Sequence, residues 1–450
     1  MSDTRASGWG RDFGIFWTAQ TLSMLGDSFA LIALPLLVLE ATGSVARMGL
    51  LTAVGGAASV LAAVFAGVVV DRVDRRRLLI ACDLARMALY GLIPLVWLAG
   101  PRIWLLYLVL PLCEAVGMLF SVAYVTAVRS LVDTERITAA NGRLNATAAA
   151  AGVAGPVCAG FVAAVAGPAM AVAVDAVSFG VSALCLTFLR FTPTARPGSG
   201  TEGETAGATG ATGLWRDLLT GVAFLMRHPV LRALTGLLTV FCFLELGLTD
   251  LVIYHLKHDL GQNDGAVGTV LAVAALGGIT GSLLVARIRR RLGFGPTWAA
   301  AMAVCGCAIS GIGWARNLPS VAVLAALLLT GAAISGACSM SLRQQVTPEH
   351  LLGRVTSAFW TLHYAAAPFG AAVITWAAQH HGTAPVAAAA GAGTVAIALV
   401  GLLTPVRARH PEAAGRADGA VDPREPSHPR GIARRAEPAE GSPAGGSAGR

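Results

Sequence analysis

Charged residues are scarce in this chain, and this scarcity is the first constraint on its fold. Only 13% of the 450 residues are charged, whereas 55% are hydrophobic, and the mean hydropathy is +0.67. A soluble domain carries about 25% charged residues, so this chain lacks the polar surface needed to face water. The composition instead predicts an all-α membrane protein with several spans, whose apolar surplus faces lipid.

Lysine is almost absent. Of the 33 basic residues, 32 are arginines, and the one lysine is Lys257 in YHLKHDLG. A Walker A loop needs a lysine that reaches the β- and γ-phosphates after a glycine-rich turn. The chain therefore contains no nucleotide-hydrolysing motor of that kind, and we expect no ATPase to be needed.

Sequence signatures of metal and disulfide chemistry are also missing. None of the eight cysteines forms a C-x-x-C pair, and no cysteine and histidine cluster has zinc spacing. All eight lie within apolar runs, where they are expected to pack as small hydrophobic residues. With no nucleophile constellation either, we expect no metal, no cofactor and no enzyme activity.

Long apolar runs are what the sequence does contain. A membrane helix needs about 20 apolar residues. Twelve candidate spans lie near residues 13–39, 48–70, 78–99, 103–128, 144–166, 170–190, 232–255, 265–286, 296–314, 319–341, 354–378 and 385–405. With the N-terminus inside, 28 arginines fall on the cytoplasmic side and 4 basic residues outside. This asymmetry predicts that both termini are cytoplasmic.

Four parts of the chain differ in composition. Residues 1–192 and 231–405 each hold six predicted spans. Residues 193–230 begin as a polar, glycine-rich cytoplasmic linker. They continue as LWRDLLTGVAFLMRHP, whose apolar positions share one face of a helix expected to lie in the inner membrane interface. Residues 406–450 have no aromatic residue and are rich in proline, glycine, alanine and charge, so we expect a disordered cytoplasmic tail.

The two sets of spans are related by an internal repeat. A shift of 214 residues places Gly67 on Gly281 and RRR at 75–77 on RRR at 289–291. The same shift aligns Arg129, Val132 and Glu135 with Arg343, Val346 and Glu349. Each half is therefore predicted to be a copy of one six-helix unit, as in many secondary transporters.

The charged segment GVVVDRVDRRR at 67–77 resembles a motif of the major facilitator superfamily, which reads approximately G-x-x-x-D-[RK]-x-G-x-[RK]-[RK]. Asp74 stands where the second glycine usually is, and the other motif positions are held by Gly67, Asp71, Arg72, Arg76 and Arg77. The sequences MLGDSFALIALPLLVLEATGS and LIACDLARM resemble the macrolide-efflux and enterobactin-exporter type permeases. This resemblance covers about residues 13–405 and implies two pseudo-symmetric six-helix bundles in the major facilitator fold.

Within this segment, the acid needs a separate explanation from the arginines. The positive-inside rule and contact with anionic headgroups account for the basic residues, including Arg75, Arg76 and Arg77. Asp71 has no counterpart, because Val285 occupies its place in the second half. The resemblance implies that Asp71 meets the start of span eleven in the outward-open state. That start contains Gly353 and Arg354 at a helix N-terminus, whose dipole favours a carboxylate, so we predict that Asp71 is a latch between the halves.

Span five contains AGVAGPVCAG, a glycine and proline motif. In the resembling family, a glycine-rich stretch ending in GPxxG marks drug and proton antiporters. Here the spacing is one residue longer, and the motif positions are Gly152, Gly155, Pro156 and Gly160. The alternative is close helix packing alone, because small residues let helices approach each other and proline removes a backbone hydrogen bond.

Ionisable residues inside predicted spans are candidate functional groups. Each costs about 2.5–3.5 kcal/mol or more to insert, so each needs a reason. Asp27, Glu114 and Glu245 lie near the middles of spans one, four and seven, and Asp250 lies nearer the outer end of span seven. The resemblance implies that spans one, four, seven and ten line the central cavity. There these carboxyl groups could exchange protons or attract a cationic substrate; the alternative is that they only hold helices together.

Other polar residues in or near the predicted spans are expected to have structural roles. Asp83 and Arg86, placed near the inner end of span three, are expected to form a structural i, i+3 ion pair. Asp175 is expected at the membrane interface, and His363 is expected to be a packing group more often than part of a proton relay.

We therefore expect a proton-driven efflux permease that exports an amphipathic drug, antibiotic or secondary metabolite by alternating access. The alternatives are a narrow-specificity siderophore exporter and a proton-coupled uptake symporter of the same fold. Expected partners are the small-molecule substrate, protons and membrane lipids, without nucleic acid, and the protein is expected to act as a monomer. An abundance of alanine, glycine, valine and arginine indicates a bacterial gene, hence a multi-pass protein of the bacterial inner membrane.

Overall fold

A computed structural model describes residues 11–132, 137–189, 211–348 and 351–411, and the regular elements in these ranges are all helical. The helices are α1 (Arg11–Thr42), α2 (Val45–Arg72), α3 (Arg75–Trp97), α4 (Ile103–Leu131), α5 (Ile137–Ala166), α6 (Pro168–Thr187), α7 (Ala211–Arg227), α8 (Pro229–Glu245), α9 (Leu248–Tyr254), η2 (His255–Asp259), α10 (Asp264–Leu292), α11 (Phe294–Trp314), α12 (Leu318–Val346), α13 (Leu352–His381), α14 (Thr383–Leu403) and η4 (Pro405–Arg407). Residues 193–210 of the expected linker and 412–450 of the expected tail lie outside the described residues.

Eleven stretches of the described chain are long and apolar enough to cross a membrane, one fewer than the sequence predicts. The exception is predicted span eleven, which forms the 30-residue helix α13. Arg354, His363 and the pair His380 and His381 lower its hydropathy. The helix is nevertheless as long as its neighbours and lies between α2 and α8.

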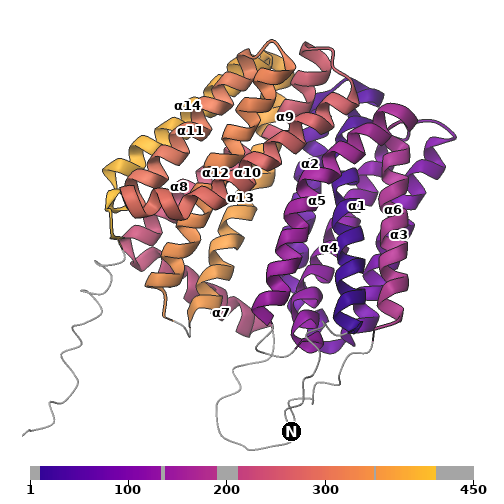
Figure 1. Ribbon diagram of the computed structural model, residues 1–450, viewed down its shortest axis with the longest axis horizontal. Helices are drawn as coiled ribbons and strands as arrows, with labels where there is room; N and C mark the ends of the chain where they lie inside the picture. Colours follow the sequence, from indigo (N-terminus) through magenta and orange to yellow (C-terminus); the bar gives the residue numbers. More distant parts are fainter. Residues whose placement is uncertain (1–10, 133–136, 190–210, 349–350, 412–450) are drawn as a thin grey trace, which may run out of the picture.

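The helices form two groups (Figure 1). The first half, α1 to α6, is built on contacts of α6 with α1 and α3 and of α2 with α4. The second half, α8 to α14, is built on contacts of α12 with α10 and α11 and of α11 with α14. Most contacts between the halves come from two helix pairs, α2 with α13 and α5 with α10. Helix α9 adds smaller contacts with α1 and α2.

The contacts between the halves gather at one end of the molecule, which we call the closed end. Gly49, near the start of α2, lies against Thr375, near the end of α13. Gly160, near the end of α5, lies against Gly268, near the start of α10. The opposite end, called the α7 end, carries the hairpin between α2 and α3 and the start of α13 (Figure 1).

Helix α7 follows the described gap and covers the start of α13. Its Leu225 is fully buried, and a Cβ at Gly221 would collide with the backbone carbonyl of Arg354. Its Leu219, by contrast, is exposed. Part of the apolar face that the sequence predicts for this helix therefore packs against α13, and part of it is exposed.

Predicted span seven is not one continuous α-helix. Helix α8 ends at Glu245, the chain turns at Leu246 and Gly247, and α9 begins at Leu248. A π-helical turn, η2, then extends the span to Asp259. The interruption places the two acids of this span, Glu245 and Asp250, on different helices.

Candidate functional site

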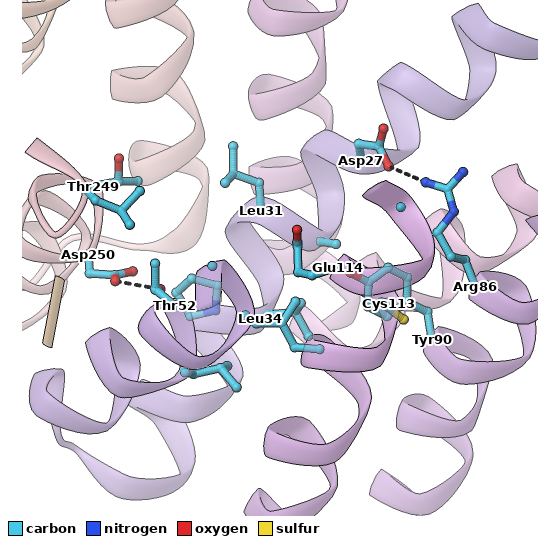
Figure 2. A pocket seen from close by; sticks show the side chains of 18 of the residues that line it. Asp27, Leu31, Leu34, Thr52, Arg86, Tyr90, Cys113, Glu114, Thr249 and Asp250 are labelled. Atoms are coloured by element: carbon cyan, nitrogen blue, oxygen red, sulfur yellow. Dashed lines mark hydrogen bonds and ion pairs between the residues drawn. The ribbon is translucent and has the colours of Figure 1, made fainter. Parts of the chain in front are cut away.

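A cavity of about 510 Å³ lies where the first half faces α9 of the second half (Figure 2). Its polar lining residues include Asp27 on α1, Thr52 on α2, Arg86 on α3, Glu114 on α4, and Thr249 and Asp250 on α9. Leucines, glycines, Tyr90 and Phe179 supply most of the remaining wall. The cavity thus combines apolar walls with three carboxyl groups and one guanidinium, the lining expected of a small-molecule site.

Asp27 lies midway along α1 and faces the cavity. Its side chain is 53% exposed, so it is open to the cavity contents rather than enclosed by helices. Its Oδ1 lies 3.8 Å from Nη1 of Arg86, and Figure 2 shows the two side chains pointing toward each other. The acid placed in span one by sequence is therefore paired with a basic group on another helix.

Arg86 has a larger role in the geometry than the sequence indicates. Its Nη2 donates a 2.6 Å hydrogen bond to Asp83, so the i, i+3 pair is present. However, Arg86 lies midway along α3 rather than near its inner end, and it lines the cavity. Its guanidinium also lies 4.6 Å from the Phe120 ring centroid and 4.0 Å from that of Phe179, in cation–π geometry.

The sequence held one signal for this role. Arg86 is the one arginine or lysine that lies in a predicted span away from its ends. The position of this buried guanidinium depends on a cavity acid, an enclosed acid and two aromatic rings. If one of the acids changes charge, the balance of forces on the guanidinium changes.

Asp175 is a second residue that the sequence placed wrongly. It was expected at the membrane interface, but its side chain is fully buried between α6 and α1. Ser178 donates a 3.3 Å hydrogen bond to its Oδ1. A Cβ at Gly26 would lie 2.6 Å from that same oxygen, so the absence of a side chain at position 26 lets this acid approach α1.

Two of the three remaining predicted cavity acids line the cavity. Glu114 and Asp250 line the cavity, and Thr52 donates a 2.7 Å hydrogen bond to Asp250 across the two halves (Figure 2). Glu245 is half-buried at the end of α8 and is not among the lining residues. Of the two acids predicted for this span, Asp250, which follows the turn at Leu246 and Gly247, lines the cavity, and Glu245, which precedes it, does not.

The hairpin between α2 and α3 lies at the α7 end. Gly67, Asp71 and Arg72 belong to the last turns of α2, but the surroundings of these three residues are not described. Asp74, which replaces the motif's second glycine, caps α3: its Oδ1 accepts a 2.9 Å hydrogen bond from the Arg77 backbone N–H. The departure from the motif therefore supplies an N-cap to the next helix.

The three arginines of this hairpin have different surroundings. Arg76 donates from Nε to the Leu186 carbonyl at 3.2 Å and from Nη2 to the Thr187 carbonyl, at the end of α6. A cation at that position satisfies carbonyl groups that the last helical turn leaves unpaired. Arg75 is half-buried and Arg77 is exposed. Arg76 thus ties the hairpin to α6 in addition to any role in orientation.

The start of α13, where Asp71 is predicted to dock, contacts α7 in this conformation. Gly353 and Arg354 are exposed in the first turn of α13, and the Arg354 backbone contacts Gly221 of α7. The latch was assigned to the outward-open state, so it stays a prediction.

The glycine and proline motif of α5 lies partly at the interface between the halves. Gly152 has open space beside it, and Gly155 lies against Ser28 of α1. A Cβ at Gly160 would lie 2.7 Å from the Asp264 carbonyl oxygen and 2.9 Å from Cα of Gly268. A Cβ at Gly268 would in turn collide with the Pro156 carbonyl.

Gly160 and Gly268 therefore make a close helix crossing between α5 and α10 at the closed end. The sequence indicated close packing of this motif but not its partner. Gly268 lies in an ordinary-looking apolar run, and nothing in the sequence connects it to position 160.

A charged cluster also spans the closed end. Lys257 on η2 contacts Asp264 of α10, and its Nζ lies 3.9 Å from Oε1 of Glu40 on α1. The turn carrying it is held by His255, whose Nδ1 lies 2.8 Å from Asp259 Oδ2. The one lysine of the chain thus links the two halves electrostatically.

His363 is a packing group in this conformation. It is buried on α13, and its Nδ1 donates a 2.7 Å hydrogen bond to the Phe359 carbonyl. Its ring lies 3.8 Å from the Phe359 ring, which Arg343 covers on α12. It does not line the cavity. Within the described part of the chain, no group of three or more histidine, cysteine, aspartate or glutamate residues is arranged to hold a metal ion.

Comparisons with known proteins agree with this architecture. A profile described as Major Facilitator Superfamily matches residues 16–371. The chain is 28% identical over 382 residues to the multidrug efflux pump Tap of Mycobacterium tuberculosis (strain ATCC 25618 / H37Rv), covering 81% of this chain and 87% of that protein. It is 26% identical over 356 residues to Tap of Mycolicibacterium fortuitum, covering 77% and 84%.

Solved structures with the same fold transport various substrates. A bacterial metal transporter superposes with a TM-score of 0.62 at 18% identity, covering 88% of this chain and 99% of that one. The nucleoside transporter NupG gives 0.66 at 11% identity, covering 88% and 99%. A bacterial homologue of the iron transporter ferroportin, in an inward-facing state, gives 0.64 at 17%, covering 87% and 98%. At these identities the similarity shows the fold alone.

Proposed function

The chain belongs to the major facilitator superfamily of membrane transporters, and we propose that it exports amphipathic small molecules by proton antiport. The observation that carries this proposal is the cavity between the halves, where carboxyl groups from α1, α4 and α9 meet apolar walls. The relationship to multidrug efflux pumps supports export over uptake.

The proposed coupling site is Asp27. As a carboxyl group open to the cavity, it can bind a proton from one side of the membrane and release it on the other. When Asp27 is ionised it attracts both Arg86, 3.8 Å away, and a cationic substrate. When it is protonated it attracts neither. Proton binding and substrate binding at Asp27 therefore oppose each other, which is the condition for exchange.

The cavity lining supports an amphipathic cation as substrate. Asp27, Glu114 and Asp250 face the space together with only one guanidinium, that of Arg86. The apolar wall, including Leu31, offers hydrophobic area to a ring system. A cation with a flat apolar body would use both features, whereas an anion would meet three acids.

Alternating access provides the transport path. The halves contact each other at the closed end, and positive-inside asymmetry supports a cytoplasmic location for the α7 end. We therefore propose that this is an inward-facing state of a monomer in a bacterial inner membrane. In this arrangement α13 also crosses the membrane and brings the number of spans to twelve, with six in each half. Helix α7 lies along the membrane interface.

Transport in a drug-sensitive bacterial host tests the proposal. Cells that express the protein should retain less ethidium, an amphipathic cation, than cells with an empty vector, and a protonophore should remove the difference. Everted vesicles should take up ethidium when a proton gradient is imposed. Greater accumulation of a panel of cationic dyes in intact cells would instead indicate uptake and would contradict the assignment of export.

A further inference from the structure

Three carboxyl groups surround a single guanidinium inside the first half. Asp27 comes from α1, Asp83 from α3 and Asp175 from α6, and Arg86 lies among them. If all three acids were ionised, the cluster would carry a net charge of −2, and two of its acids, Asp83 and Asp175, are fully buried. Uncompensated buried charge of this kind is strongly unfavourable, so at least one carboxyl group must hold a proton.

The hydrogen bonds identify Asp175 as that group. Arg86 is engaged with Asp83 at 2.6 Å and lies 3.8 Å from Asp27, which is also open to the cavity. Asp175 is fully buried and receives only the 3.3 Å hydrogen bond from Ser178. Its Oδ2 has no hydrogen-bond partner. It is therefore the acid with the least compensation for a negative charge.

Arg86 also lies near Asp175, although the two form no direct ion pair in this conformation. Its guanidinium is 4.0 Å from the ring centroid of Phe179, which is one helical turn after Asp175 on the same face of α6. One turn is about 5.4 Å along the axis. Asp175 also lies against Gly26, the residue directly before Asp27. The two acids thus approach the same guanidinium from neighbouring helices.

We propose that Asp175 is a second proton-binding residue of the transport cycle, coupled to Asp27 through Arg86. This inference rests on the proposed proton antiport. When Asp27 takes up a proton, its attraction for Arg86 is lost, and the guanidinium becomes available to an ionised Asp175. The O–H bond at Asp175 then breaks, and its proton moves to a water molecule that enters from the cavity. Arg86 keeps its own protons throughout.

Other ionisable groups near this site are accounted for. Those facing it are Asp27 on α1, Cys82, Asp83, Arg86 and Tyr90 on α3, and Cys113 and Glu114 on α4. The ionisable residues in the described part of α5, Arg143 and Cys158, are exposed. Arg86 is therefore the one cation in this set, and a proton gained by one acid changes the charge balance felt by the others.

A structural role for Asp175 would have different consequences. An acid that only held α6 against α1 would affect folding without contributing a titration step. Infrared spectroscopy of the purified protein separates the two, since the C=O stretch of a protonated carboxyl group is distinct from that of a carboxylate. This measurement needs no substrate, so a negative result for Asp175 can be distinguished from a negative result in the export assay.

The experiment compares pH-dependent infrared spectra and ethidium efflux of the wild type and Asp175→Asn, with Asp74→Asn as control. Asp74 caps α3 and is exposed, and asparagine can also cap. We expect Asp175→Asn to lose one protonated-carboxyl band and to alter the pH profile of efflux, while the control matches the wild type. An unchanged spectrum would overturn the proposal, and so would a lost band with an unchanged efflux profile.

A second variant covers the case in which Asp175→Asn fails to fold. Ser178→Ala removes the hydrogen bond to Oδ1 and leaves the acid in place. It should shift the pH at which the buried carboxyl band disappears. A band that titrates as in the wild type would contradict the role of Asp175.

Discussion

Thr52 on α2 donates a 2.7 Å hydrogen bond to Asp250 on α9, so one of the cavity acids is tied to the opposite half of the protein. Both residues line the cavity (Figure 2). Movement of the halves must break this bond or carry both partners together. The proposed substrate site and the contacts between the halves are therefore not separate.

Substituting Thr52 tests this link. Thr52→Val keeps the shape of the side chain but removes the donor, leaving Asp250 without this partner. A hydrogen bond to a charged group contributes about 1.5–3 kcal/mol, so the closed end should open more often. Distance measurements between spin labels on the two halves should show a larger outward-facing fraction. Thr52→Ser, which retains a hydroxyl group, is the control, and equal distributions in all three proteins would contradict the link.

The crossing of Gly160 and Gly268 gives a steric test. Gly160→Leu should prevent α5 from approaching α10, because the space is filled by the backbone of Asp264 and Gly268. We expect at least about a tenfold loss of efflux and a shift toward the outward-open form. Gly152→Leu is the matched control, since nothing lies within 4 Å of a Cβ there. Similar losses in both variants would show that leucine harms α5 in general.

Lys257 provides an electrostatic test of the closed end. Lys257→Gln removes the charge that faces Glu40 on the other half. Exposed ion pairs contribute about 1 kcal/mol or less, so the population of outward-open molecules should rise only several-fold. The rise should resemble the effect of high salt on the wild type. If salt and Lys257→Gln had additive effects of similar size, the cluster would not be the salt-sensitive contact.

Asp71 offers a prediction that rests on the sequence. Asp71→Asn should slow turnover more than it weakens substrate binding, because the latch is expected to act on conformational exchange. Efflux rates and equilibrium ethidium binding to the purified protein measure the two effects separately. Weaker binding with unchanged turnover would rule out the latch.

Much of this fold could be read from the sequence because membrane spans are local. The major facilitator resemblance is confirmed, and eleven of twelve predicted spans meet the criteria for crossing a membrane. Contacts within one helix were equally accessible, as with Asp83 and Arg86 at i, i+3. The exception, predicted span eleven, forms α13. It has the required length but not the hydropathy, because it carries polar and basic side chains between two neighbouring helices.

Contacts between helices could not be predicted in the same way. The approach of Arg86 to Asp27, and of Asp175 to Gly26, depends on how α1, α3 and α6 are rotated about their axes. Whether Glu245 or Asp250 lines the cavity depends on how the chain is oriented on each side of the turn at Gly247. Glycine is common throughout these spans, so the sequence does not mark this turn. Sequence thus supplied candidate acids, but tertiary packing decides which of them share a cavity.

The role of Asp27 is the central claim, and proton-driven exchange in reconstituted vesicles tests it most directly. The measurement is ethidium transport driven by an imposed proton gradient, with the wild type and Asp27→Asn reconstituted at equal density. We predict that Asp27→Asn inserts normally and still lets ethidium equilibrate, but no longer concentrates it against its gradient. Gradient-driven accumulation by Asp27→Asn at the wild-type rate would contradict the claim.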